Sequence, residues 1–188
     1  DAHGTDWGPR GRGTVRGAVR VEKTIIVDRP AQELYALWHD FEQLPRFMSH
    51  LLAVRAEGNR LSHWVARGPA GSRVEWDAEL ISDHTNELIA WRSLEGADVD
   101  HAGSVRFSPA PGARGTLVRL ELEYRPPTGA TGARLARLLG RDLEEQLAAD
   151  LVRFRQFAET GELARTEGQP TGRAHGITRR AEELARAA

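Results

Sequence analysis

A long apolar stripe near the C-terminus predicts one amphipathic helix from Thr131 to Thr160. Leucines recur every four residues, and other apolar residues extend the stripe: Leu135, Leu139, Leu143, Leu147, Leu151, Phe154 and Ala158. Charged residues, including Asp150, are assigned to the other faces, and Gly161 is the expected C-terminal stop. No other helical pattern is long enough to cover this stripe, so we expect a sheet to bury it.

Alternating apolar and polar residues predict strands before this helix. The expected strands run from Val19 to Val27, Leu51 to Ala56, Leu61 to Arg67, Ser72 to Ser82, Leu88 to Leu94, Val99 to Phe107 and Thr116 to Tyr124. In the first of them Lys23 interrupts the apolar face, so the sequence does not determine which face of this strand points inward. A bulge would explain the interruption. In the fourth, Trp76 faces inward while Glu75, Asp77 and Glu79 face water, with Arg92 and Arg119 as candidate cross-strand partners.

Two short helical segments are expected between the first and second strands. Pro30 is placed in the first turn of the first segment, and a second short helix or packed turn follows it. The apolar residues of this region are Leu34, Leu37, Trp38, Phe41, Leu44, Phe47 and Met48. The element order predicts an α+β fold, in which a strongly curved antiparallel sheet of about seven strands wraps around the long C-terminal helix.

Composition indicates one soluble globular domain with tails. The chain has 188 residues, of which 40% are hydrophobic and 28% charged, and its net charge of -1 predicts no nucleic-acid partner. The expected boundaries are a flexible arm over 1–17, the domain over 18–161 and a mostly disordered tail over 162–188. With no cysteine, thiol catalysis and disulfides are excluded.

We expect the protein to be cytoplasmic, because no signal peptide and no apolar run of about 20 residues is present. The chain begins at Asp1 and not at Met. An upstream segment could therefore associate this protein with a membrane. The residues give no prediction of the oligomeric state.

Several blocks of sequence resemble the SRPBCC superfamily of START and birch-pollen-allergen-like helix-grip proteins. The blocks are Val21–Ile25, Arg29–Tyr35, Trp38–Met48, Ser62–Trp64, Gly68–Gly71, Glu75–Glu79 and Ile89–Ser93. Within that superfamily the chain is similar to the bacterial polyketide cyclase/dehydrase-like branch. The resemblance spans roughly Val19 to Gly161. It implies a helix-grip fold whose cavity binds lipids, polyketides, hormones or quinone-like molecules, and it transfers no catalytic residue.

Large rings and small residues on the inward faces form the candidate ligand-binding set. Ala78 and Gly103 are expected to leave room for a ligand, while Trp38, Phe41, Phe47 and Met48 are expected to form a mouth. The full set is Trp38, Phe41, Phe47, Met48, Trp64, Trp76, Trp91, His101, Gly103, Phe107, Leu139, Leu143 and Leu147. The alternative is that these side chains simply fill the core.

His101 lies on an otherwise apolar strand face, where a neutral imidazole could act as an acid–base group or contact the polar end of a ligand. The alternative is a hydrogen-bonded core histidine. No HExxH spacing is present, so no metal site and no cofactor are expected. Three functions stay open: a non-catalytic binding or carrier domain for a hydrophobic small molecule, a cyclase or dehydratase with His101 as its acid–base residue, and an interaction module with a filled core.

Overall fold

The computed structural model describes residues 18–68, 71–97, 100–112, 114–125 and 130–161, with side chains of the long helix described from residue 142 onward. The elements are β1 (Val19–Val27), α1 (Ala31–His39), the 3-10 helix η1 (Phe41–Arg46), β2 (Leu51–Ala56), β3 (Leu61–Arg67), β4 (Arg73–His84), β5 (Leu88–Ser93), β6 (Asp100–Pro109), β7 (Thr116–Arg125) and α2 (Ala130–Thr160). The expected arms, 1–17 and 162–188, lie outside the described residues, so the domain boundaries stay a prediction. No helix in the described part has the length and apolarity to cross a membrane.

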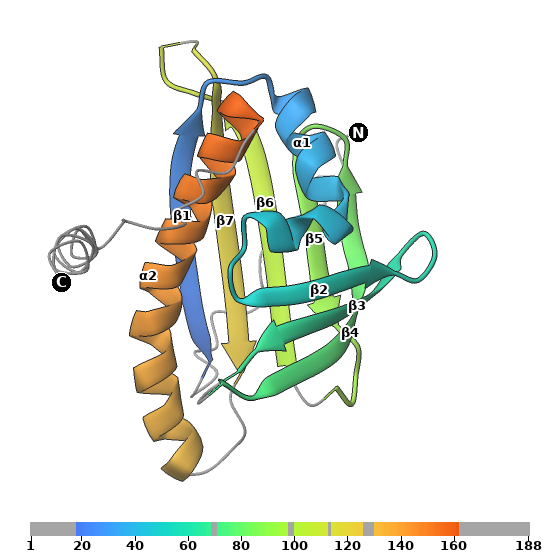
Figure 1. The fold of residues 1–188 in the computed structure, drawn as a ribbon, viewed down its shortest axis with the longest axis vertical. Helices are drawn as coiled ribbons and strands as arrows, with labels where there is room; N and C mark the ends of the chain where they lie inside the picture. The colour runs from blue at the N-terminus through green and yellow to red at the C-terminus, as the bar shows by residue number, and fades with distance from the viewer. Residues whose placement is uncertain (1–17, 69–70, 98–99, 113, 126–129, 162–188) are drawn as a thin grey trace, which may run out of the picture.

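All seven strands form one antiparallel sheet, in the order β1-β7-β6-β5-β4-β3-β2 (Figure 1). From β2 to β7, each strand is hydrogen-bonded to the next strand along the chain, and β1 pairs with the free edge of β7. The long helix α2 lies over β1 on the concave side, and α1 with η1 covers the other end. The structure confirms the predicted α+β helix-grip fold, and each strand begins and ends within two residues of its expected position.

The first strand pairs with β7 without a register shift, from Val19 opposite Tyr124 to Val27 opposite Thr116. The bulge considered for this strand is therefore absent. Lys23 does lie on the inward side, where its ammonium group contacts the carboxylate of Glu144 on α2 at 2.5 Å. The long aliphatic stem lets a lysine cross the gap between sheet and helix while its charge stays near water.

The buried face of α2 follows the predicted stripe with one exception. Leu147, Leu151 and Phe154 are buried as expected, and Phe157 joins them. Asp150 is buried as well, with only 1% of its surface exposed, so its assignment to an outer face was wrong. The position three residues after Leu147 and four before Phe154 belongs to the same helix face.

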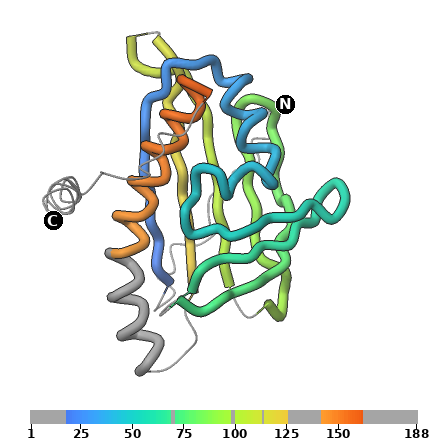
Figure 2. The backbone as a smooth tube through the Cα atoms, in the orientation of Figure 1, coloured from blue at the N-terminus to red at the C-terminus, as the bar shows by residue number. Residues whose placement is uncertain are grey.

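The end of α2 is tied to the loop between β1 and α1, and Figure 2 shows these two segments beside each other. Arg29 donates from Nε to the carbonyl oxygen of Ala158 at 3.0 Å and from Nη2 to that of Glu159 at 2.6 Å. Gly161 follows with a φ of 73°, and its N–H donates to the Phe157 carbonyl. A C-terminal helix stop at Gly161 is confirmed, because this left-handed conformation suits glycine.

The short helices differ slightly from expectation. Pro30 is the N-cap residue of α1, one position before the first turn. The second segment, η1, is a 3-10 helix with Pro45 inside it. Trp38 and Phe47 from these two segments pack edge to face at 5.4 Å, and both also contact Phe154 of α2. One end of the grip is therefore closed by an aromatic cluster.

Candidate functional site

A cavity of about 470 Å³ lies between the sheet and α2. It opens beside the part of α2 that precedes the buried segment starting at Leu147. The lining residues come from the η1–β2 link, from β3, β4, β6 and β7, and from α2: Ser49, His50, Ala66, Arg67, Gly68, Val74, Trp76, His101, Leu122, Tyr124, Asp142, Leu143 and Gln146. The volume is within the range of small-molecule sites, which is roughly 300–1,000 Å³.

The inner wall of the cavity is aromatic. Trp76 on β4 and the imidazole of His101 on β6 lie with their ring centres 5.5 Å apart. Behind Trp76, the ring of Trp64 stacks on it at 5.9 Å, and Trp91 stacks on Trp64 at 5.8 Å. These strands are adjacent in the sheet or separated by one strand, so alternation along each strand places the rings in one row. The row gives the cavity a rigid, flat wall.

Four buried nitrogen atoms have no hydrogen-bond partner among the described residues: Trp38 Nε1, Trp76 Nε1, Trp91 Nε1 and His101 Nδ1. Of these four residues, Trp76 and His101 line the cavity. The backbone N–H of His101 donates to Ser93 Oγ at 3.0 Å, which fixes the strand but leaves the ring free. An unpaired buried polar group costs about 1–3 kcal/mol. A ligand carrying a suitable polar group would recover that free energy.

Two polar side chains of the cavity lining, His101 and Tyr124, are uncharged near neutral pH. Burial, followed by the nearby charge of His50, lowers the pKa of His101 to about 4. Burial also raises the pKa of the Tyr124 phenol, so this group keeps its proton. Both residues therefore offer neutral hydrogen-bonding groups to the cavity.

A buried carboxylate supports the rim of the cavity at Ser49 and His50. Asp150 accepts hydrogen bonds from the backbone N–H and the hydroxyl of Ser49, both at 3.1 Å, and Arg153 donates to the same oxygen, Oδ1. Its Oδ2 lies 3.2 Å from His50 Nδ1. Burial alone would raise the pKa of Asp150, but the hydrogen bonds from His50, Ser49 and Arg153 outweigh it and lower the pKa.

An ionised carboxylate only accepts hydrogen bonds, so His50 Nδ1 carries the proton in this contact. The other ring nitrogen, Nε2, is then free to accept a proton when the imidazole is neutral. Sequence reasoning missed His50 and Asp150 as site residues. The available signal was the helical spacing of Asp150 with Leu147 and Phe154, which marks a carboxylate on a buried face.

Only part of the predicted ligand-binding set lines this cavity. Trp76, His101 and Leu143 do so, and the cavity adds residues that the sequence did not suggest, among them His50 and Tyr124. The side chain of Leu139 lies outside the described residues. The other predicted residues pack in or against the hydrophobic core and are absent from the cavity lining: Trp38, Phe41, Phe47, Met48, Trp64, Trp91, Gly103, Phe107 and Leu147.

The space expected above Gly103 is filled by the protein itself. A Cβ atom at this position would lie 2.4 Å from Cζ2 of Trp91 and 2.9 Å from a methyl group of Leu122. Ala78 is fully buried. The expectation that Gly103 leaves room for a ligand was wrong, because the small residue accommodates the large ring of the paired strand.

Three of the four residues expected at a mouth near the short helices are buried. Trp38, Phe47 and Met48 are exposed by at most 2%. Phe41 packs edge to face on Trp64 and Trp91, but it is half-buried and lines a separate groove of about 500 Å³ beside the short helices. The three buried residues therefore form a plug at one end of the sheet, and the cavity opens at the other end, beside β3 and the start of β4.

The outer face of the sheet carries the predicted acidic row as an ion-pair network. His63 on β3 contacts Asp77 at 2.7 Å and Glu75 at 3.3 Å, which confirms that these carboxylates face water. Arg92 pairs with Glu79 at 2.7 Å. Arg119, the second expected partner of this row, instead pairs with Glu22 on β1 at 3.3 Å.

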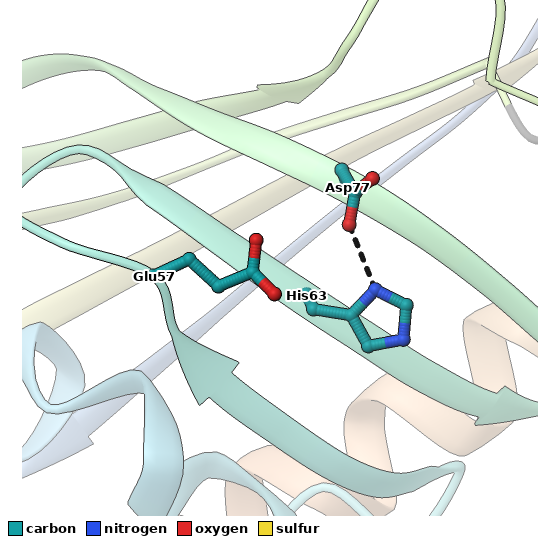
Figure 3. Close-up of side chains that lie close together, drawn as sticks. All are labelled: Glu57, His63 and Asp77. Carbon is teal, nitrogen blue, oxygen red and sulfur yellow. Dashed lines mark hydrogen bonds and ion pairs between the residues drawn. The ribbon is translucent and has the colours of Figure 1, made fainter.

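Glu57, His63 and Asp77 bring three metal-ligand types together on this face, with donor atoms within 4.8 Å of one another (Figure 3). They come from the β2–β3 turn, β3 and β4, so no local spacing motif encodes the group. Glu57 and Asp77 are exposed and His63 is half-buried. The hydrogen bond between His63 and Asp77 accounts for the arrangement, and we describe the group as part of the ion-pair network.

Comparison with known proteins agrees with this geometry. The family model for polyketide cyclase / dehydrase and lipid transport matches residues 27–152. The chain belongs to this family. An uncharacterised 17.2 kDa protein of Streptomyces lincolnensis is 31% identical over 155 residues, which cover 81% of this chain and 94% of the relative.

Two solved structures share the fold of this chain. A crystal structure of a Deinococcus radiodurans protein has 39% identity and a TM-score of 0.63, and the match covers 76% of this chain and 99% of that one. A START superfamily protein from Mycobacterium smegmatis has 20% identity and a TM-score of 0.57 over 73% of this chain and 98% of that one. At that identity the second likeness supports the fold alone.

Proposed function

We propose that this protein binds a hydrophobic small molecule in the cavity between α2 and the sheet, as a binding or carrier domain. The observation that carries the proposal is the cavity of about 470 Å³, which has the Trp76 ring on its wall. Apolar side chains such as Leu122 and Leu143 face the same space. A lipid, a polyketide or a quinone-like molecule fits this combination of flat apolar wall and few polar groups.

A second candidate function is acid–base chemistry on a ligand in the same cavity, of the cyclase or dehydratase type that the family description includes. The contact between Asp150 and His50 favours it, because a buried carboxylate that orients an imidazole is the usual support of a general base. His101 is a second imidazole on the lining. The third function considered from the sequence is an interaction module with a filled core. It has less support, because a cavity of about 470 Å³ lies between the sheet and α2.

The test of binding uses N-phenyl-1-naphthylamine, an uncharged fluorescent probe. We expect its emission to rise on binding and the tryptophan emission to fall, because Trp76 lines the cavity and the Trp64 ring stacks on it from behind. Leu143→Trp puts a large side chain into the cavity and is expected to lower probe affinity at least tenfold. Val152→Trp is the matched control, since Val152 is an exposed apolar residue of the same helix.

If Leu143→Trp folds and binds the probe as the wild type does, the ligand site lies elsewhere. A wild-type protein that never binds the probe would favour the interaction module. The catalytic candidate is separated by incubating the protein with a poly-β-ketone mimic and following product by mass spectrometry. Turnover that is lost in His50→Gln while probe binding is kept would favour an enzyme over a carrier.

A further inference from the structure

We infer that the inner end of the cavity is a subsite for an uncharged hydroxyl or carbonyl group, formed by Trp76 and His101, and that the protein discriminates against ligands whose polar end is a carboxylate. This inference rests on the proposed function, because it assumes that the cavity takes a small molecule. It goes further by stating the class of polar group that the ligand carries.

The first support is the pair of buried nitrogens without partners. The indole N–H of Trp76 can only donate, and it has no acceptor among the described residues. His101 Nδ1 either donates or accepts, depending on its tautomer. A hydroxyl group both donates and accepts, so it pairs with the indole and with either tautomer, whereas a carbonyl oxygen accepts from the indole.

The second support is the distribution of charge around the cavity. Among the described lining residues, the full charges are those of Arg67 and Asp142, which are both exposed and have opposite signs. Any charge on His50 is offset by its partner Asp150. An exposed arginine gives a ligand little net attraction, because solvent screens it and the nearby acid opposes it. Among the described lining residues, the one cationic group near His101 is therefore that of His50 when it is protonated, and Asp150 already pairs with it.

A carboxylate that enters this end loses its hydration without gaining an ion pair, and this loss is strongly unfavourable. An uncharged hydroxyl loses much less and gains the two hydrogen bonds. The Trp76 ring and the apolar side chains of Leu122 and Leu143 accept the apolar body of either molecule equally well. The discrimination therefore comes from the polar end alone, and ligands with the same ring system isolate it.

The test uses the full chain at pH 7 and three probes with one ring system: naphthalene, 2-naphthol, which is uncharged at this pH, and 2-naphthoate, which is an anion. Each competes with N-phenyl-1-naphthylamine. We expect 2-naphthol to bind at least about tenfold more tightly than 2-naphthoate, a ratio that corresponds to about 1.4 kcal/mol. We also expect it to bind several-fold more tightly than naphthalene.

His101→Phe keeps a ring of similar size and removes the nitrogens. It should lower the affinity for 2-naphthol several-fold, with the Trp76 N–H left as the remaining hydrogen-bonding group, and leave the affinity for naphthalene unchanged. His84→Phe, at the far end of β4 and exposed, is the matched control and should change neither affinity. If His101→Phe fails to fold, the ratio of the wild-type affinities for 2-naphthol and 2-naphthoate tests the inference by itself.

Equal affinities for 2-naphthol and 2-naphthoate would overturn the neutral subsite while leaving the proposed function intact. The same holds if folded His101→Phe binds 2-naphthol as tightly as the wild type does. Failure of N-phenyl-1-naphthylamine and naphthalene to bind at all would instead overturn the proposed function, and the subsite with it.

Discussion

His50, just before β2, and Asp150, on α2, meet with His50 Nδ1 3.2 Å from Asp150 Oδ2, although 100 residues separate them in the chain. The same carboxylate holds Ser49 through two hydrogen bonds. One buried charge thus fastens the rim of the cavity to the long helix. The contact links the stability of the fold to the shape of the cavity, because His50 and Ser49 both line the cavity.

Asp150→Asn is predicted to lower the free energy of unfolding by about 2–4 kcal/mol. The amide keeps the shape of the side chain but turns one acceptor into a donor that faces other donors. It also removes the charge opposite Arg153. Chemical denaturation monitored by tryptophan fluorescence measures the change.

The control for this variant is Glu145→Gln, an isosteric change at an exposed position of the same helix. We expect its effect to stay within about 0.5 kcal/mol, as is usual for surface substitutions. Equal, small effects of the two variants would mean that Asp150 contributes no more than a surface carboxylate. Such a result would contradict the role of this residue as the anchor of the rim.

The contribution of Asp150 is predicted to depend on pH in the acid range. Its pKa in the folded protein is lowered, because the hydrogen bonds to the charged form outweigh burial. Its stabilising effect is therefore present above the unfolded value of about 3.9 and is lost as the pH falls through the lower folded value. The difference in unfolding free energy between wild type and Asp150→Asn should be constant above about pH 5 and shrink below about pH 4. A difference that grows on acidification would contradict this sign.

His63 on the outer face is predicted to titrate above its ordinary value. Its hydrogen bond with Asp77 raises the pKa, and this effect exceeds the opposing one of burial. Because the folded pKa is raised, the associated stability is complete below about pH 6.5 and is lost as the pH rises through the folded value. Solvent screens these groups, so we propose a direct measurement of the imidazole titration by NMR.

Asp77→Asn should lower the NMR midpoint of His63, since it removes the first cause of the shift. Glu57→Gln is the matched control. Glu57 lies in the same group of three, but no hydrogen bond joins it to His63. The midpoint should change little in this variant. A midpoint that moves equally in both would mean that general surface charge, and not the bond to Asp77, sets the titration of His63.

Local patterns were sufficient to predict most of the fold. Residue alternation in β4 placed Trp76 and Ala78 inward and Glu75 outward, because the pleat of a strand makes every second side chain share a face. The spacing of Leu147, Leu151 and Phe154 likewise identified the buried face of α2. Lys23 was ambiguous from the sequence alone, since its inward position depends on a carboxylate 121 residues away in the chain.

The candidate site was harder to predict, because it depends on contacts between distant segments. Gly103 looked like empty space in the sequence, but the residue opposite it on β5 is Trp91, whose ring occupies that space. Asp150 looked like one more solvent-facing charge on a polar helix. Its partners lie in a link that no local pattern pairs with the helix. The surroundings of Gly103 and Asp150 could be predicted only once the strand register and the position of the helix were known.

Gly103→Ala is predicted to destabilise the protein by about 1–3 kcal/mol, although alanine is only one methyl group larger. The added Cβ would meet the Trp91 ring at 2.4 Å, and this ring is itself held between the Phe41 and Trp64 rings. The backbone of Gly103 is not among those with positive φ, so the cost is steric. Urea denaturation of the variant measures it.

A double-variant cycle identifies the cause of that loss. Trp91→Phe removes the part of the indole ring nearest to Gly103 and is expected to destabilise by itself, because it leaves a cavity in the core. In that background Gly103→Ala should cost much less, since the methyl group enters the vacated space, and the coupling should be about 1 kcal/mol or more. Additive effects would mean that the Trp91 ring is not what limits the side chain at position 103. The methyl group of Leu122, which lies 2.9 Å from the same Cβ position, would then be the limiting contact.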